Sequence, residues 1–339
     1  MCRFMKITLL AGICLISCSR HILREAYPLL NDGKYDSEFP YRNCSRELQA
    51  ISESIIKIYT TDYYTIYYFD KEARVAMQPV TAELLKKARS LATFEKTSSG
   101  SALVLLAEPT RVALLTCAHI VSHLDTLKSF YAPDENGQGG YLQNLVIKNR
   151  RVLQVTGFPQ GGAMEVLASD LETDIAIIGK SYSRAIPQPI TKFAYPLGNA
   201  RELEWGSFVY MIGYPMGFRM VTKGIVSQPN RNGRGSFITD ATFNTGFSGG
   251  AVLAIRDGVP HFELVGIATS SSAKSEMVLT PNRTDAYDFY TPYEGPVYVA
   301  QQDKINYGIT LNISVEMIRD FIAAHQEELA AAGYDLSGL

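Results

Sequence analysis

The feature that most restricts the fold is a series of short apolar segments between residues 97 and 270, separated by turn-forming residues. Segments such as "ALVLLA" (102–107), "DIAIIGK" (174–180) and "AVLAI" (251–255) have the length and composition of buried strands. A parallel α/β sheet needs helical crossovers between its strands, and none is visible here. The pattern therefore predicts an all-β sandwich or barrel arrangement.

The flanking regions differ from this central part. Residues 54–69 ("SIIKIYTTDYYTIYYF") are rich in Ile, Thr and Tyr and predict a further strand. Residues 81–92 predict a helix, because Leu84, Leu85, Ala88 and Leu91 form one apolar stripe. A closing helix is expected to begin at Ser314, which can cap it, and to end at Gly333.

Bulk composition excludes several classes of protein. With 339 residues, 46% hydrophobic and 19% charged, the chain can bury a sizeable core in one large domain or two ordinary ones. Its formal net charge of −2 provides no basic face for nucleic acid. No stretch reaches eighteen consecutive apolar residues, so no membrane-spanning helix is predicted.

The N-terminus has the composition of an export signal. Arg3 and Lys6 precede the apolar run 7–16, and "LISC" resembles a bacterial lipobox. We predict that residues 1–17 are removed, that Cys18 is lipidated, and that residues 18–45 tether the protein to the membrane. The protein is then expected in the bacterial cell envelope, exported to the periplasmic or outer-surface side. A plain signal peptide and a late start codon are the alternatives.

Two cysteines remain outside the export segment, Cys44 and Cys117. They are too few for a disulfide framework or a four-thiolate zinc site. Pairing in an oxidising compartment is one possibility, and two unrelated buried thiols is the favoured one.

The sequence "NTGFSGGAVL" (244–253) places Ser248 among glycines before an apolar run. A serine on such a turn is a candidate nucleophile, although a tight polar hairpin has the same composition. A nucleophilic serine needs an adjacent base and a group that orients the base. The pattern G-x-S-x-G also fits the nucleophile elbow of α/β-hydrolases, but the segment after Ser248 predicts a strand where that fold has a helix.

His119 is the candidate base because it follows a buried strand, although a structural histidine there is common. Asp174 opens an apolar strand, so its carboxylate is expected to be partly buried and to need a partner. His119 and His123 have the spacing of a zinc pair, but Ile120 stands where a zinc protease has its glutamate. No metal or cofactor is predicted.

Several motifs together resemble the HtrA-type (DegP-like) trypsin-fold serine endopeptidases. The chain resembles this family from about residue 97 to 325, with the motifs in the family's order: "GSALVLLAEPTRVALLTCAHIV", "DLETDIAIIGK", "LGNARELEWGSFVYMIGYPMG", "FITDATFNTGFSGGAVL" and "INYGITLNISVEMIRDFI".

The resemblance implies two antiparallel six-stranded β-barrels, over residues 46–185 and 186–312, followed by a C-terminal helix over 313–339. It also implies an active site between the barrels. Its catalytic residues are expected to be a nucleophile, a general base and an orienting carboxylate: Ser248, His119 and Asp174. The backbone N–H groups of Gly246 and Ser248 are expected to form the oxyanion hole.

The same resemblance implies protein or peptide substrates, here exported or misfolded envelope proteins, and leaves a homo-oligomer open. Thr242 is expected near the base of the primary specificity pocket, so small or medium apolar side chains should be preferred. Ala268, Thr269 and Ser270 are expected to pair with the substrate backbone as an added strand.

The chain departs from the family pattern in three respects. Phe247 stands where these proteins have Asn or Asp, so activation by an ion pair to that residue is unavailable. The segment after residue 325 is not expected to hold a PDZ domain. Residues 271–304 look like an aromatic insertion that can cap the site, contact a subunit or pack on itself; its aromatic residues are Tyr287, Phe289, Tyr290, Tyr293 and Tyr298. A catalytically inactive trypsin-fold lipoprotein that acts as a binding module is therefore the alternative function.

Overall fold

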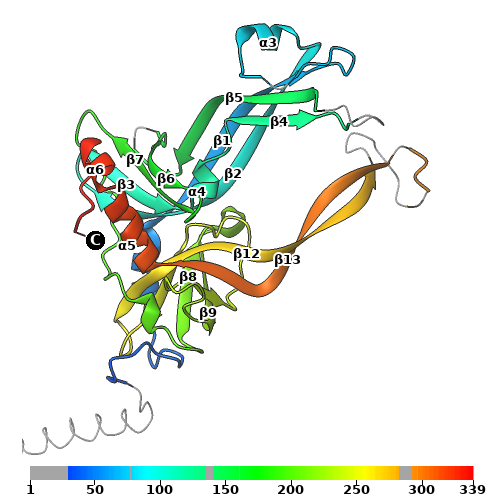
Figure 1. Cartoon of the computed structure of the whole chain (residues 1–339). Helices are drawn as coiled ribbons and strands as arrows, with labels where there is room; N and C mark the ends of the chain where they lie inside the picture. The colour runs from blue at the N-terminus through cyan, green and yellow to red at the C-terminus, as the bar shows by residue number, and fades with distance from the viewer. Residues whose placement is uncertain are drawn as a thin grey trace, which may run out of the picture.

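The computed structural model describes residues 30–338, except residues 77, 134–139, 160, 282–289, 291 and 296. The chain forms two antiparallel β units, with two helices beside them at the C-terminal end (Figure 1). The predicted export segment and Cys18 lie outside the described residues. Within the described part, none of the helices is both long and apolar enough to cross a membrane.

The first β unit is a curled sheet of seven strands in the order β4-β5-β1-β2-β3-β7-β6. Its strands are β1 (Ile55–Tyr68), β2 (Ser90–Ala107), β3 (Arg111–Thr116), β4 (Thr126–Phe130), β5 (Leu142–Val155), β6 (Glu165–Asp170) and β7 (Ile175–Ser181). Three short helices accompany it: α2 (Ser45–Glu53), α3 (Ala82–Lys86) and α4 (Ala118–Val121). Strands β1, β2 and β5 extend well past the core, and α3 lies at their far end (Figure 1).

Burial along β1 explains its orientation. Ile58, Thr60, Asp62 and Tyr64 are all buried, whereas the residues between them are only partly buried. This alternation of two is the side-chain period of a strand, so one face of β1 points into the sheet's interior. Because of this alternation, the Asp62 side chain points into the interior.

The second β unit is a closed barrel in the order β10-β13-β12-β11-β8-β9. Its strands are β8 (Phe208–Gly213), β9 (Met220–Gln228), β10 (Phe237–Thr239), β11 (Ala251–Ile255), β12 (Phe262–Pro281) and β13 (Val297–Ser314). Two 3-10 turns, η1 (Ala200–Glu202) and η2 (Pro215–Gly217), lie between these elements. Buried apolar side chains fill the barrel, among them Val209, Met211, Phe237, Val252 and Val265.

The C-terminal helices α5 (Val315–Ala324) and α6 (Gln326–Ala331) pack on the main core. The hydroxyl of Ser314 accepts a hydrogen bond from the Met317 N–H, so this residue caps α5 as predicted. The expected single helix is broken at His325. Gly333 follows with a φ of +87°, a left-handed conformation that favours glycine.

The all-β prediction is confirmed, with two differences in detail. The first unit is a curled sheet of seven strands rather than a closed six-stranded barrel, and β4 adds to its edge by pairing with the long β5. The helix predicted over 81–92 is confirmed only for α3. Residues from Ser90 onward join β2 and pair with β1, because cross-strand pairing outweighs a weak local helix preference.

The predicted insertion over 271–304 belongs largely to a two-stranded ribbon, in which β12 and β13 continue past the barrel (Figure 1). This ribbon exposes apolar side chains: Met277, Leu279, Val297 and Val299 are each more than half exposed. Tyr290 is also exposed, whereas Tyr287 and Phe289 lie outside the described residues.

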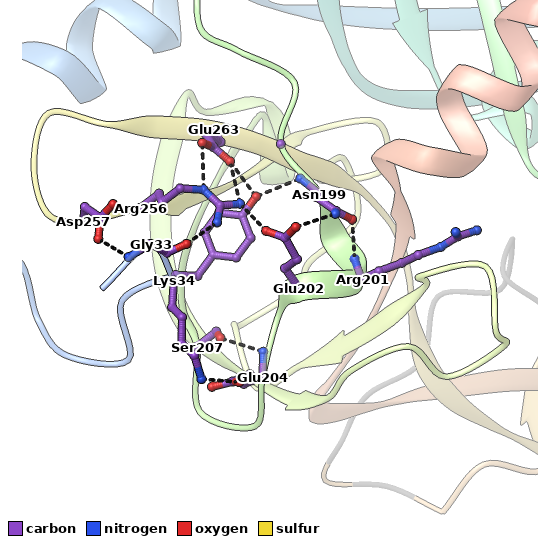
Figure 2. Close-up of polar contacts among 12 residues, drawn as sticks. Gly33, Lys34, Asn199, Arg201, Glu202, Glu204, Ser207, Arg256, Asp257 and Glu263 are labelled. Carbon is purple, nitrogen blue, oxygen red and sulfur yellow. Dashed lines mark hydrogen bonds and ion pairs between the residues drawn. The ribbon is translucent and has the colours of Figure 1, made fainter. Parts of the chain in front are cut away.

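Part of the expected tether is packed against the second barrel instead of lying free (Figure 2). Gly33 donates its N–H to Asp257, and its carbonyl accepts from Arg256 at 2.6 Å. Tyr35 is buried, and its hydroxyl donates to Glu263 at 2.6 Å. The Arg256 guanidinium lies 4.1 Å from the centre of the Tyr35 ring. The part of residues 18–45 around Tyr35 is therefore ordered on the barrel, where the contact of an aromatic ring with a partly buried arginine stabilises it.

Candidate active site

His119 is positioned by the end of a buried strand. Strand β3 is buried from Val112 to Thr116, and α4 begins directly after Cys117. The backbone N–H of His119 donates to Asp174 Oδ1 at 2.9 Å. The carboxylate therefore fixes the backbone of the histidine as well as its ring.

Asp174 stands immediately before β7 with a φ of +57°. Its carboxylate oxygens lie 3.0 and 2.9 Å from His119 Nδ1, and the Thr269 hydroxyl donates to Oδ2. Burial works to raise the pKa of Asp174, but the hydrogen bond and charge of His119, together with Thr269, hold that pKa below its ordinary value. The carboxylate is therefore ionised, and the Nδ1 proton of His119 points toward it. Among the described residues, none forms a hydrogen bond with Nε2.

Ser248 lies in the nucleophile loop, defined here as residues 244–250, between β10 and β11. Its hydroxyl donates to the Thr269 carbonyl at 2.8 Å. Thr269 thus contacts two members of the predicted triad. The Thr269 hydroxyl contacts Asp174, and the Thr269 carbonyl contacts Ser248. The structure brings His119 and Asp174 into direct contact and connects Ser248 to them through Thr269.

Glycines give the nucleophile loop its shape. Gly246 and Gly249 have φ values of +103° and +80°, which other residues rarely adopt. A Cβ on Gly246 would lie 2.3 Å from the Tyr214 carbonyl oxygen, and one on Gly250 would lie 2.6 Å from that of Ile212. The glycines are needed because the loop lies directly against neighbouring backbone, which explains the composition around Ser248.

The backbone N–H groups of Gly246 and Ser248, like those of Asn244 and Thr245, have no acceptor among the described residues. The Thr245 carbonyl accepts from the Met216 N–H at 2.8 Å, and the Phe247 carbonyl accepts from the Gly250 N–H at 2.7 Å. In a trans peptide the N–H points opposite to the C=O of the same unit. These bonds therefore fix the direction of the Gly246 and Ser248 N–H groups.

The residues predicted to contact substrate are placed differently from one another. Thr242 is exposed on the loop that leads to Ser248. The Ala268 N–H and C=O are both bonded to the nucleophile loop, to Gly250 and Gly249. The next residue along β12 is Thr269, whose carbonyl accepts from the Ser248 hydroxyl. Ser270 follows it. The hydroxyl contact between Thr269 and Asp174 was not predicted from the sequence.

His123 and His119 do not face one another as a metal pair. The His123 ring nitrogens are 2.9 Å from Asp62 Oδ2 and 2.9 Å from Ser98 Oγ. Asp62 also accepts two hydrogen bonds from Arg151, at 2.8 and 2.9 Å. This buried cluster was missed, because only the period of β1 indicated that Asp62 points inward.

Cys117 lies near His119 and Asp174, with its sulfur within 4.8 Å of their ligand atoms. Burial, followed by the charge of Asp174, raises the pKa of the thiol well above its ordinary value. Metal binding needs a thiolate, so this group fits a metal poorly. Cys44 and Cys117 are both buried and free, in agreement with the favoured prediction.

The His123 cluster predicts a loss of stability on acidification. Burial lowers the pKa of His123, so the folded protein resists a proton that the unfolded chain takes up below a pH of about 6.5. Stability should therefore fall as the pH drops through this range. It should fall again below a pH of about 4, where the unfolded chain protonates Asp62, whose folded pKa is lowered. Urea unfolding midpoints between pH 8 and 5 measure the first loss. A His123→Gln variant that keeps the same slope there would contradict the assignment.

Comparisons with known proteins identify the family of this chain. A family model described as a trypsin-like peptidase domain matches residues 91–267, more than half of the chain. Two solved structures are similar: "Crystal structure of Deg5" (19% identity, TM-score 0.37, covering 67% of this chain and 83% of that one) and "Kallikrein-related peptidase 10" (10% identity, TM-score 0.36, covering 84% and 99%). A comparison with curated protein sequences returned no match. The chain belongs to the family of trypsin-like peptidase domains, and His119, Asp174 and Ser248 all lie within the matched region.

Proposed function

We propose that this protein is a serine endopeptidase that hydrolyses peptide bonds of exported or misfolded proteins in the bacterial cell envelope. The observation that carries the proposal is the His119–Asp174 contact, which orients the imidazole through Nδ1 and leaves Nε2 without a partner among the described residues. A neutral imidazole held in this way is a general base for a nearby hydroxyl.

The proposed reaction begins when the Ser248 hydroxyl leaves the Thr269 carbonyl and turns to His119 Nε2. Its oxygen attacks the scissile carbonyl carbon while Nε2 takes the proton. The N–H groups of Gly246 and Ser248 stabilise the oxyanion that forms. The imidazolium then protonates the leaving amine as the C–N bond breaks. Water, deprotonated by the same nitrogen, hydrolyses the acyl-enzyme and restores Ser248.

The resting contact of Ser248 bears on how a substrate activates the site. A peptide that binds along β12 brings a backbone N–H toward the Thr269 carbonyl, which now accepts from the Ser248 hydroxyl. Competition for this carbonyl releases the hydroxyl for His119.

With no acidic side chain at Thr242, we propose a preference for small or medium apolar side chains. A peptide-library profile dominated by cleavage after Lys or Arg would overturn that preference.

The envelope location rests on the N-terminal sequence, with Arg3 and Lys6 before the apolar run and Cys18 after it. The alternative function, a binding lipoprotein without activity, is favoured by the resting contact of Ser248 and by the exposed apolar side chains of the β12–β13 ribbon. Exposed apolar surface of this kind is common at interaction sites.

A fluorophosphonate probe separates the two functions. We expect stoichiometric labelling of the folded protein, abolished in Ser248→Ala because the nucleophile is gone. The matched control is Ser98→Ala, since Ser98 is hydrogen-bonded to His123, which in turn contacts Asp62. This variant should label as the parent does. Labelling that is lost in Ser98→Ala and kept in Ser248→Ala would reassign the nucleophile. No labelling of the folded parent would support the binding module.

A further inference from the structure

Ser101 of β2 belongs to the first β unit, but its bonds reach the second. It is fully buried, and its hydroxyl donates to the Gly246 carbonyl at 2.8 Å and accepts from the Tyr214 N–H at 2.8 Å. Its backbone N–H donates to the Ser248 carbonyl at 2.8 Å. Ser101 therefore contacts the nucleophile loop through both its side chain and its main chain.

A hydrogen bond from Thr116 holds the Ser101 backbone in place. The Thr116 hydroxyl donates to the Ser101 carbonyl at 2.8 Å, and Thr116 is itself fully buried at the end of β3. The fit is close on the loop side as well: a Cβ on Gly249 would lie 2.1 Å from the Ser101 carbonyl oxygen. A Cβ on Gly213 would lie 2.7 Å from Ser101 Oγ. Little space remains for the loop or the serine to shift.

These contacts act on the peptide units that directly follow those carrying the Gly246 and Ser248 N–H groups. The Ser101 hydroxyl fixes the Gly246 carbonyl, and its bond to Tyr214 fixes the segment whose Met216 N–H holds the Thr245 carbonyl. The unit from Thr245 to Gly246 carries the Gly246 N–H. Its orientation therefore depends on the Ser101 hydroxyl in two ways, through the following unit, whose Gly246 carbonyl Ser101 holds, and through the Tyr214 segment, whose Met216 N–H holds the Thr245 carbonyl.

The inner side of the loop is held by an apolar contact. Phe247 is only 2% exposed and belongs to the second-barrel core, with its ring centre 6.2 Å from that of Phe243. A Cβ on Gly213 would lie 2.9 Å from the Phe247 ring. Phe247 has no charge, so this contact needs no ion pair. The first described residues of the chain dock elsewhere, at Arg256 and Asp257.

We infer that Ser101 is a positioning residue that, together with the buried Phe247 ring, holds the nucleophile loop in its working shape without any cleavage of the chain. The inference rests on the proposed function and deepens it, because it states what orders the oxyanion hole. Ser101 itself contacts no reacting atom, and it acts through the carbonyls of Gly246 and Ser248.

The test compares Ser101→Ala with Ser54→Ala. Ser54 is also buried in the first unit, where its hydroxyl donates to the Ile51 carbonyl at 2.7 Å, and none of its hydrogen bonds to the described residues reaches the nucleophile loop. Two quantities are measured on folded protein: kcat and KM for a peptide substrate, and amide hydrogen exchange of residues 244–250. Both variants lose one buried hydroxyl, so a general loss of stability affects both.

For Ser101→Ala we expect kcat to fall on the order of 10²-fold, as for loss of one oxyanion-hole donor, with KM within about threefold of the parent. Exchange of the loop amides should rise. Ser54→Ala should leave kcat within about twofold. A folded Ser101→Ala protein with parental kcat, or with unchanged loop exchange, overturns the inference. If the parent itself neither hydrolyses peptides nor reacts with the probe, the proposed function fails. Loop exchange then decides alone whether Ser101 holds the loop.

Discussion

Replacing Asp174 by asparagine is expected to lower kcat by about four orders of magnitude while the protein stays folded. The carboxylate holds the proton of His119 on Nδ1, at 2.9 Å. An asparagine amide can donate to Nδ1 instead, and the ring proton then moves to Nε2, where it blocks the acceptance of the Ser248 proton. The variant should fold, because asparagine tolerates a φ of +57° and its oxygen can still accept from the His119 N–H.

The measurement is kcat with a peptide substrate, at a folded fraction checked by circular dichroism. Asp170→Asn is the matched control, since Asp170 lies four residues earlier and accepts only from its own turn, Glu172 and Thr173. This control should change kcat by less than about twofold. An Asp174→Asn protein with kcat within tenfold of the parent would show that His119 is not oriented by Asp174 during the reaction.

The second large effect is expected on stability, from Asp62→Ala. The Asp62 side chain is fully buried, and its carboxylate bonds Arg151 and His123. Removing it leaves a largely buried guanidinium without its partner, which costs about 3–5 kcal/mol of unfolding free energy. Urea unfolding of parent and variant measures the loss.

An exposed ion pair gives the comparison for this prediction. Arg89 and Asp70 lie 3.0 Å apart with side chains 72% and 42% exposed. Asp70→Ala should therefore cost no more than about 1 kcal/mol. An additional Arg151→Met change should recover part of the loss in the Asp62→Ala protein, because it removes the unpaired charge. Equal losses from Asp62→Ala and Asp70→Ala would show that burial of the pair does not matter.

Much of the local structure followed from residue patterns. The apolar run 112–116 and the run after Asp174 predicted two buried strands, and the structure pairs them as β3 and β7. Pairing of β3 with β7 brings the end of one strand to the start of the other, which explains how His119 meets Asp174. The capping residue Ser314 was also visible in the sequence, because helix caps are local.

Features that depend on distant contacts were not predictable in this way. Residues 90–92 look helical by themselves, but they pair with β1 because a strand partner was available. The docked position of Tyr35 depends on Glu263 and Arg256, more than two hundred residues away. Local sequence contains no information about such partners.

The sequence by itself determined the β class, the order of His119, Asp174 and Ser248, and the glycine-rich turn around the serine, because each depends on short-range composition and spacing. Only the tertiary structure decided the partner of each group: Thr269 for the Ser248 hydroxyl, Ser101 for the Gly246 carbonyl, and Asp62 for His123. Hydrogen bonds extend over about 3 Å and depend on direction, so they are fixed only when both β units have packed.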